Sequence, residues 1–314
     1  MGASDAGVSM ERHVEFPSQG AILRGRLFLP SQAGDPPPIV VMAHGYSATA
    51  TGMVADRYAE VFRRAGMAVL LYDHFGFGRS GGEPRQQIDH WLQVIGYRDA
   101  IDFVGSVPGI DGSRLALWGD SMSGACALAT AGMDGRVRAI VAQVPALGDS
   151  PPPADRDGAL FGAMARTYAR ALLDPATGPA GGPIPVVSSD QLRSPSALTP
   201  LTAYRWFIEY GARYGTGWQN SVTAASRNGA EPYHPGLCAA RVRAPALFVI
   251  ASHDEMPGAS STVARSVFER LPGPKELIEL DGGHFGLLYH PGALFDQASS
   301  AECDFLVRCL AASR

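Results

Sequence analysis

Uninterrupted apolar stretches alternate with amphipathic segments along most of this sequence. Runs that have the length of strands occupy residues 38–43, 67–72, 115–118, 137–144, 246–250 and 276–280, and those at 38–43, 67–72, 115–118 and 246–250 are apolar throughout. A strand that is apolar throughout is buried on both faces of its sheet, which requires helices above and below it. Between these runs apolar residues recur at helical spacing, for example at Ile88, Trp91, Leu92 and Ile95. The pattern predicts an α/β fold with a mostly parallel sheet, preceded by a hairpin at residues 13–30.

The alternation stops between about residues 150 and 240, where Pro, Gly and Ser are frequent. Helical spacing survives there only near residues 161–172 and 201–214. We expect residues 1–149 and 241–314 to form the core, with residues 150–240 as an inserted, mainly helical lid. Ligands bind at the carboxyl ends of the strands in open α/β sheets, so the lid is expected to lie over that edge.

The strongest chemical signal is the segment Gly119-Asp120-Ser121-Met122-Ser123-Gly124, which follows an apolar strand and opens a helix. A nucleophilic serine needs a sharp strand-to-helix turn that exposes its hydroxyl, with small residues two positions before and after it. Gly119 and Ser123 meet this requirement, although glycine is commoner than serine at the second position. The segment predicts that Ser121 is a nucleophile.

A serine nucleophile needs a histidine base, and the histidine needs an acid that fixes its tautomer. In this arrangement the acid and the histidine follow the serine in that order. Asp254 and His284 each follow a predicted strand, so both should lie at the same sheet edge as Ser121. We predict these two as acid and base. Glu255 is the alternative acid, and His253 is a weaker alternative base because it precedes the acid.

Two backbone N–H groups are expected to bind the oxyanion of a tetrahedral intermediate. One is that of Met122, directly after the nucleophile and at a helix N-terminus. The other is that of Tyr46, in the loop His44-Gly45-Tyr46-Ser47 after the strand at residues 38–43. The aromatic residues Phe161, Tyr204, Trp206 and Phe207 of the predicted lid are candidates for lining an apolar acyl pocket.

A second glycine-rich segment, Gly76-Phe77-Gly78-Arg79-Ser80-Gly81, matches the dinucleotide fingerprint G-x-G-x-x-G. That fingerprint works only where a helix begins and receives the pyrophosphate on its N-terminus. Gly82-Glu83-Pro84 follows at once and prevents such a helix. We therefore expect no nucleotide cofactor here. No HExxH motif or His/Cys cluster indicates a metal site, and no cofactor of any kind is predicted.

Composition and charge limit the classes of molecule that this protein is expected to bind. The net charge of −4, with both signs spread along the chain, disfavours nucleic acid as a ligand. No apolar run reaches the ~18 residues that a membrane span needs. The four cysteines form no CxxC pair, which fits reduced thiols. Residues 1–15 are polar and lack the apolar core of a signal peptide. We expect a soluble cytoplasmic protein that acts on a small molecule, and the sequence leaves open whether it forms a homodimer.

The segments 72–80, 119–124 and 282–285 resemble the α/β-hydrolase superfamily. They are more closely similar to its dienelactone-hydrolase-like and X-Pro-dipeptidyl-peptidase-like branch, which includes fungal polyketide transferases. In that branch a serine at the position of Ser123 is usual. The resemblance implies an eight-stranded, mostly parallel sheet, and hydrolysis or transfer of an ester, thioester or lactone acyl group. Two positions depart from the branch: Asp120 places a charge beside the nucleophile, and His74 stands where asparagine or arginine is commoner.

These observations favour a serine hydrolase that forms an acyl-enzyme on Ser121. Three alternatives remain open. An acyltransferase would use the same acyl-enzyme with an alcohol or amine as acceptor. A prolyl peptidase would need an acidic anchor for the free amine of its substrate, and the predicted lid offers no clear acidic pair. A ligand receptor built on an inactive hydrolase would have no use for an intact set of serine, acid and histidine.

Overall fold

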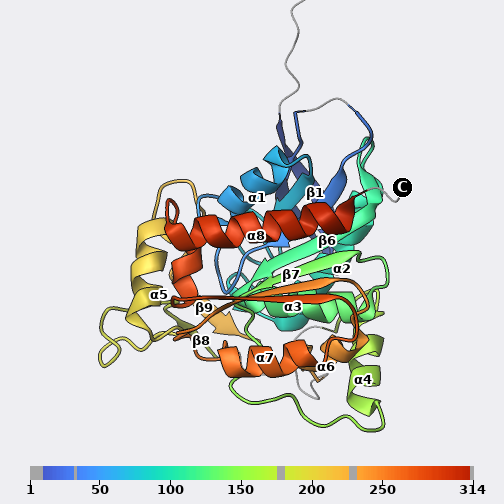
Figure 1. Ribbon diagram of the computed structural model, residues 1–314. Helices are drawn as coiled ribbons and strands as arrows, with labels where there is room; N and C mark the ends of the chain where they lie inside the picture. Colours follow the sequence, from blue (N-terminus) through green and yellow to red (C-terminus); the bar gives the residue numbers. More distant parts are fainter. Residues whose placement is uncertain (1–9, 32–33, 175–180, 226–231, 312–314) are drawn as a thin grey trace, which may run out of the picture.

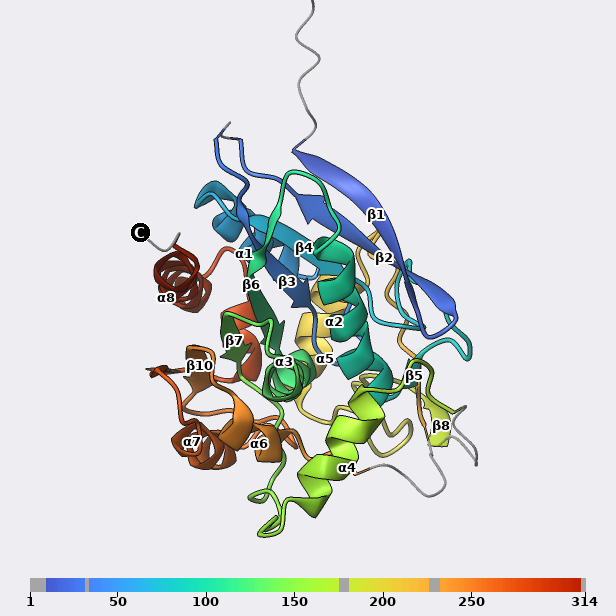
Figure 2. The same ribbon diagram turned by 90° about the vertical axis from the view of Figure 1, so that its right-hand side faces the viewer.

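An eight-stranded sheet runs through the centre of the molecule, with helices on both of its faces (Figures 1 and 2). The computed structural model describes residues 10–31, 34–174, 181–225 and 232–311, so that residues 1–9 of the polar N-terminal segment lie outside the described ranges. In spatial order the strands are β1 (Glu11–Ser18), β2 (Ala21–Phe28), β4 (Ala68–Tyr72), β3 (Pro38–Ala43), β6 (Asp111–Asp120), β7 (Ala139–Gln143), β10 (Ala246–Ala251) and β11 (Lys275–Leu280).

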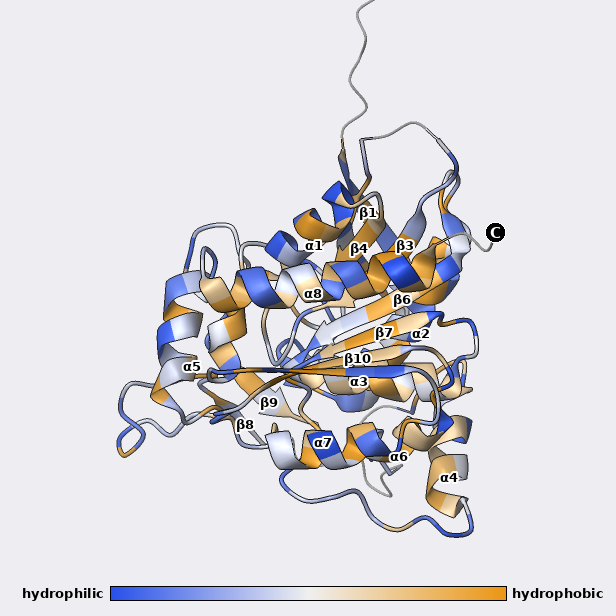
Figure 3. Cartoon of the chain, viewed as in Figure 1, coloured by the Kyte–Doolittle hydropathy of each residue, from blue (hydrophilic) through white to orange (hydrophobic). Residues whose placement is uncertain are grey.

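The β1–β2 and β2–β4 pairs are antiparallel, and every other neighbouring pair is parallel. This confirms the predicted mostly parallel sheet. Strand β3 shows why its sequence is apolar throughout. Val40 and Met42 join the core on one face, and Ile39 and Val41 join the core on the other. Figure 3 shows the same distribution, with apolar strands inside and polar residues on the outer helices.

The helices divide between the two faces of the sheet. Helices α1 (Ala55–Arg64) and α8 (Ala293–Leu310) contribute Tyr58, Phe62 and Phe305 to one core. Helices α2 (His90–Val104), α3 (Ser121–Met133) and α7 (Ser261–Glu269) contribute to the other. Figure 2 shows α8 on one side of the strands, opposite α2 and α3. Each helix packs an apolar stripe against the face of the sheet that it covers.

One helix begins later than its sequence pattern predicts. Ile88 shares the helical spacing of Trp91 and Ile95, but it lies in the short strand β5 (Gln87–Ile88), which pairs with a strand from the 150–240 segment. The Asp89 carboxylate accepts hydrogen bonds from the N–H groups of Trp91 and Leu92, and this N-cap fixes the start of α2 at His90. The prediction of helix at Ile88 was therefore wrong, because periodicity alone does not register a cap.

The segment at residues 150–240 joins β7 to β10 with short elements. They are α4 (Ala159–Tyr168), β8 (Gly181–Ile184), α5 (Leu201–Trp206), the π-helix η1 (Phe207–Gly211), β9 (Val222–Ala224), α6 (Pro235–Cys238) and η2 (Ala239–Arg241). Strands β5, β9 and β8 form a separate small sheet, so the segment is not purely helical. After β11 the chain forms the 3-10 helix η3 (His284–Leu288), against which α5 packs. Within the described ranges no helix is long and apolar enough to cross a membrane.

A buried carboxyl joins α8 to the centre of the sheet. Glu302 is fully buried and accepts a hydrogen bond of 2.8 Å from the indole N–H of Trp118 on β6. Burial raises the pKa of Glu302 well above its ordinary value, and the nearby Asp120 adds to this effect. The carboxyl is therefore protonated in the folded protein over a wider pH range than in the unfolded chain.

This difference predicts how stability depends on pH. Above the ordinary pKa of glutamate the unfolded chain releases the proton while the folded protein retains it. Rising pH then lowers the free energy of unfolding by up to about 1.4 kcal/mol per pH unit. The Glu302→Gln variant removes this titration, so its stability relative to the native protein should increase from about pH 5 to about pH 8. Urea denaturation across this range measures the difference, and a difference that does not change with pH would contradict the assignment.

Candidate active site

Ser121 lies at the sharp turn between β6 and α3. Its φ of 54° falls in the left-handed region, which non-glycine residues rarely adopt. The turn is possible because α3 passes very close to β6. A Cβ on Gly119 would lie only 2.3 Å from the carbonyl carbon and oxygen of Ser123. The loop after β7 holds the turn from outside, since the Ala146 N–H donates to the Ser121 carbonyl at 2.9 Å.

Ser123 connects this turn to two other loops. Its hydroxyl donates to the carbonyl of His44 at 2.5 Å and lies 2.7 Å from Nε2 of His74. Burial lowers the pKa of His74 to about 4, so its imidazole is neutral at pH 7 and donates through Nε2. A glycine at position 123 could make neither bond. The serine here, and the histidine at position 74, are thus parts of one hydrogen-bond network.

His284 and Asp254 meet beside this turn. Nδ1 of His284, at the start of η3, lies 2.8 Å from Oδ2 of Asp254, and both side chains are 2% exposed. The other carboxylate oxygen accepts from the Met256 N–H at 3.0 Å, which fixes its orientation. Because Nδ1 is engaged by Asp254, Nε2 is the ring atom available to a second group. Ser121 and His284 line the same cavity.

The two alternative residues occupy other positions. His253 is 77% exposed in its side chain and pairs with Asp281 on the surface. Glu255 does approach His284, but through the backbone. Its Oε2 accepts from the N–H of His284 at 2.8 Å, and its Oε1 accepts from the hydroxyl of Thr202 on α5. Glu255, predicted from the sequence only as the alternative acid, thus bridges Thr202 and His284, a contact that no local sequence pattern indicates.

The loop after β3 runs alongside the turn. A Cβ on Gly45 would lie 3.0 Å from the Cβ of Ser121, so only glycine allows this approach. The N–H groups of Tyr46 and Met122 both belong to residues that line the cavity. Met122 is the second residue of α3, so its backbone N–H has no hydrogen-bond acceptor within the helix. Within the described residues, the Tyr46 N–H makes no hydrogen bond either. The arrangement leaves two donors next to Ser121 that could bind an oxyanion.

The carboxylate of Asp120 lies beneath this loop. It is buried and contacts Nδ1 of His44 at 3.0 Å, and it accepts from the Gly45 N–H at 3.1 Å. Burial by itself disfavours a charged His44. The Asp120 carboxylate and the Met53 carbonyl, which contacts Nε2, outweigh it and raise the pKa of His44. The charge beside the nucleophile is therefore balanced by a buried partner and also holds the loop that carries Tyr46.

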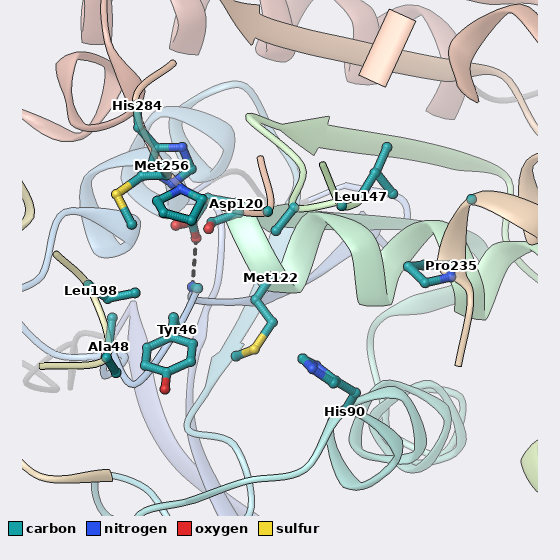
Figure 4. Close-up of a pocket in the computed structure, with 18 of the residues that line it drawn as sticks. Tyr46, Ala48, His90, Asp120, Met122, Leu147, Leu198, Pro235, Met256 and His284 are labelled. Carbon is teal, nitrogen blue, oxygen red and sulfur yellow. Dashed lines mark hydrogen bonds between the residues drawn. The ribbon is translucent and has the colours of Figure 1, made fainter. Parts of the chain in front are cut away.

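A cavity of about 560 Å³ opens in front of Ser121 (Figure 4). Of the four predicted lining residues, Trp206 and Phe207 line it, whereas Tyr204 and Phe161 are not among its walls. Tyr204 packs against the core, and Phe161 lies on α4, beneath the guanidinium of Arg241 at 4.9 Å from the ring centroid. Further walls come from residues that were not predicted from the sequence, among them Leu147, Leu198, Met256, Leu288, His90 and Tyr233.

The sequence pattern of the protein family described as "Serine aminopeptidase, S33" matches residues 34–202. This span runs from β3 through the Ser121 turn to α5 and covers more than half of the chain. The chain belongs to this family of α/β hydrolases. The resemblance seen in the sequence is thereby confirmed, and the protein is an enzyme of the hydrolase class.

Relatives with assigned names support the same conclusion. Thiohydrolase apmlB of Arthrinium phaeospermum is 30% identical over 314 residues, 96% of this chain and 98% of apmlB. Thiohydrolase aneE of Aspergillus aculeatus is 44% identical, over 42% of this chain and 41% of aneE. Polyketide transferase grgF of Penicillium is 36% identical over 48% of this chain and 50% of grgF. The crystal structure of the α/β hydrolase GrgF superposes with a TM-score of 0.72 at 26% identity, over 96% of this chain and 99% of GrgF.

In this α/β hydrolase the second glycine-rich segment, residues 76–81, has a structural role. The Asp73 carboxylate accepts from the N–H groups of Ala50 at 2.7 Å and Arg79 at 2.8 Å. It occupies the space beside Gly78, where a Cβ would lie 2.3 Å from it. No helix begins in this segment. The loop therefore surrounds a carboxylate of the chain itself, at the place where the dinucleotide fingerprint would require a phosphate.

The bridge through Glu255 gives a prediction for this hydrolase. Glu255→Ala removes both hydrogen bonds and should lower kcat for ester hydrolysis by about 10-fold, because the lost bond to the His284 N–H contributes on the order of 1.5 kcal/mol to holding the imidazole in place. Glu255→Gln should keep most of the rate, since its amide oxygen accepts from His284 and its NH₂ group donates to Thr202.

Steady-state kinetics on a p-nitrophenyl ester, together with the melting temperature of each variant, test this role. A fall in kcat at nearly constant KM and melting temperature supports positioning of His284. Equal losses in the Ala and Gln variants would contradict it, because the Gln variant retains the geometry.

Proposed function

We propose that this protein is a serine hydrolase that cleaves esters or thioesters of uncharged acyl groups through an acyl-enzyme on Ser121. The observation that carries the proposal is the buried contact of 2.8 Å between His284 Nδ1 and Asp254, beside a serine in a left-handed turn. A serine at such a turn, with an oriented imidazole lining the same cavity, is the arrangement that acyl transfer requires.

In the proposed reaction Nε2 of His284 accepts the proton of Ser121 as its oxygen attacks the substrate carbonyl. Asp254 stabilises the imidazolium and keeps Nδ1 protonated. The N–H groups of Tyr46 and Met122 bind the oxyanion, a type of contact that contributes about 3 kcal/mol per donor. The imidazolium then protonates the leaving alcohol or thiol. Water, deprotonated by His284, attacks the acyl-enzyme. The bond between the acyl carbon and the Ser121 oxygen then breaks, the imidazolium returns its proton to that oxygen, and the acid is released.

The chemistry of the cavity supports an uncharged acyl group as the substrate. No arginine or lysine is among the described residues that line it. Its one carboxylate, Asp120, is already engaged by His44 and Gly45. Burial raises the pKa of the Tyr46 phenol to about 12, which keeps that hydroxyl neutral. A carboxylate or phosphate inside such a cavity would lack a partner and lose its hydration.

We also propose that residues 150–240 act as a lid. The walls on the α5 side, Trp206 and Phe207, come from this segment, and so do Leu198 and Pro235. The indole N–H of Trp206 donates to the carbonyl of Leu288 at 2.8 Å, which joins the segment to the His284 loop. A lid attached in this way would shield the acyl-enzyme from bulk water. The cytoplasmic location that we expect from the N-terminal sequence stays a prediction.

The assignment of Ser121 has a direct test. Ser121→Ala should lower kcat on p-nitrophenyl butyrate by about 10⁴-fold or more and abolish labelling by a fluorophosphonate, because no other group replaces the nucleophile. Ser150→Ala is the matched control. Ser150 also lines the cavity and has no role in the proposed reaction, so this variant should label and turn over like the native enzyme. Labelling that survives in Ser121→Ala would refute the proposal.

Acyl transfer is the second candidate, because a relative with the same overall structure is named a polyketide transferase. Both reactions share the acyl-enzyme and differ in the acceptor that resolves it. With a thioester substrate and increasing concentrations of an added alcohol, hydrolysis predicts that the free acid remains the main product. A transferase would convert most of the acyl-enzyme to the new ester at millimolar alcohol. Product ratios by mass spectrometry decide between the two.

The family description also raises peptide hydrolysis, but the cavity gives it little support. An aminopeptidase must bind the free amine of its substrate, for which paired carboxylates are the usual partner. Asp120 is the only carboxylate among the described cavity residues, and it is already paired with His44. We therefore favour esters and thioesters over peptides.

A further inference from the structure

We infer that His90 forms a second polar site in the cavity, which binds an uncharged hydroxyl or carbonyl group of the substrate at a distance from the scissile bond. The inference rests on the proposed function and narrows its substrate class. It assigns a specificity role to a residue that the proposed reaction does not use.

The cavity has walls on both sides of Met122. In the view of Figure 4, Tyr46, Ala48, Leu198 and Met256 lie on one side of Met122, and His90, Leu147 and Pro235 lie on the other. A substrate that fills the cavity would therefore have one part near His284 and another part near His90. Among the residues labelled on that side, His90 is the one with a polar side chain, and Ser150, Tyr233 and His234 also line the cavity.

The position of the His90 ring is fixed by the elements around it. His90 is the first residue of α2, directly after the N-cap Asp89. Its imidazole stacks on the phenol ring of Tyr233, with ring centroids 4.9 Å apart and planes inclined by 4°. Tyr233 is held by the edge of Trp91 at 5.7 Å and by a contact of 3.5 Å between its hydroxyl and the Cys126 sulfur. Because one face of the imidazole is covered by Tyr233, its edge, which carries both nitrogens, is the part that can form hydrogen bonds.

Both nitrogens of His90 are open for a ligand. Among the residues that the structure describes, no hydrogen bond joins either nitrogen to a partner, and His90 lines the cavity. His90 is an exposed residue where it borders the cavity. The protein packed around its ring nevertheless lowers its pKa, against a weaker opposing effect of Asp89, so the imidazole is neutral at pH 7. A neutral imidazole offers one donor and one acceptor.

The hydrogen-bonding capacity of the neutral His90 ring determines which functional groups of a substrate can bind to it. A hydroxyl can both donate to and accept from a neutral imidazole, and a carbonyl can accept from its N–H. A carboxylate or phosphate would call for an unpaired cation. No arginine or lysine is among the described walls of the cavity, and His44 is already paired with Asp120. The substrate is therefore an acyl ester or thioester with a mostly apolar body and an oxygen function remote from the bond that is cleaved.

The test compares matched substrates that differ by one hydroxyl. In the first arm the hydroxyl moves stepwise along the acyl chain of an octanoyl thioester. In the second arm it moves along the alcohol portion of an alkyl butyrate. The measured quantity is the ratio of kcat/KM with and without the hydroxyl. We expect a ratio of about 10 at one position in the native enzyme, the value of one well-formed hydrogen bond. The arm in which it occurs identifies the part of the substrate that reaches His90.

Three variants make the test specific. His90→Phe keeps an aromatic ring against Tyr233 but has no polar edge, so its ratio should fall to about 1. His90→Gln, which still has a donor and an acceptor, should retain part of the preference. His234→Phe is the matched control at a neighbouring histidine of the cavity and should retain all of it. Titration of Ser121 with a fluorophosphonate normalises each variant to its folded fraction.

A native enzyme without hydroxyl preference in either arm would overturn the inference, and so would an unchanged ratio in His90→Phe or loss of the preference only in His234→Phe. Turnover of the unsubstituted substrates in those cases would leave the proposed hydrolase function intact. Absence of turnover with every substrate would instead count against the proposed function itself.

Discussion

The close approach of α3 to β6 is the constraint on which the rest of the site depends. Ser121 can adopt its left-handed φ only because the backbone of Ser123 passes against Gly119, where no side chain fits. Such a conformation carries a strain of about 1–3 kcal/mol, which the surrounding packing must hold. Gly45, from the loop after β3, then comes within contact of Ser121 from the opposite direction. The reactive hydroxyl and both candidate oxyanion donors are placed by this one junction.

Buried polar groups hold the loops around that junction. Asp120 binds the loop of Gly45 through its backbone and through His44, and Ser123 joins the same loop to His74. In a low-dielectric interior these contacts are strong when satisfied and costly when broken, so they specify one arrangement of the loops. Glu255 extends the same principle to the His284 loop and to α5. The position of the histidine is therefore coupled to the segment that covers the cavity.

Different parts of the cavity are suited to catalysis and to substrate selection. Near Ser121 it offers N–H donors and an oriented imidazole, which can act on any acyl carbonyl. Farther along, the apolar walls and, on our inference, the neutral edge of His90 would discriminate between substrates by shape and by one hydrogen bond. Such a division would allow relatives with the same reactive centre to act on different acyl groups, because most of the walls come from segments outside the β6–α3 turn.

The sequence by itself determined the layered architecture and the place of Ser121, because both follow from local patterns. Apolar runs identify buried parallel strands, and the glycine-serine turn must lie where a strand meets a helix. The sequence also brought Asp254 and His284 to one edge, since each follows a strand of the same sheet. Only the tertiary structure decided that Trp206, and not Phe161, lines the cavity, that Glu255 bridges Thr202 to His284, and that His90 faces the substrate space. Those contacts join residues far apart in the chain, and their geometry is set by packing, which no local spacing encodes.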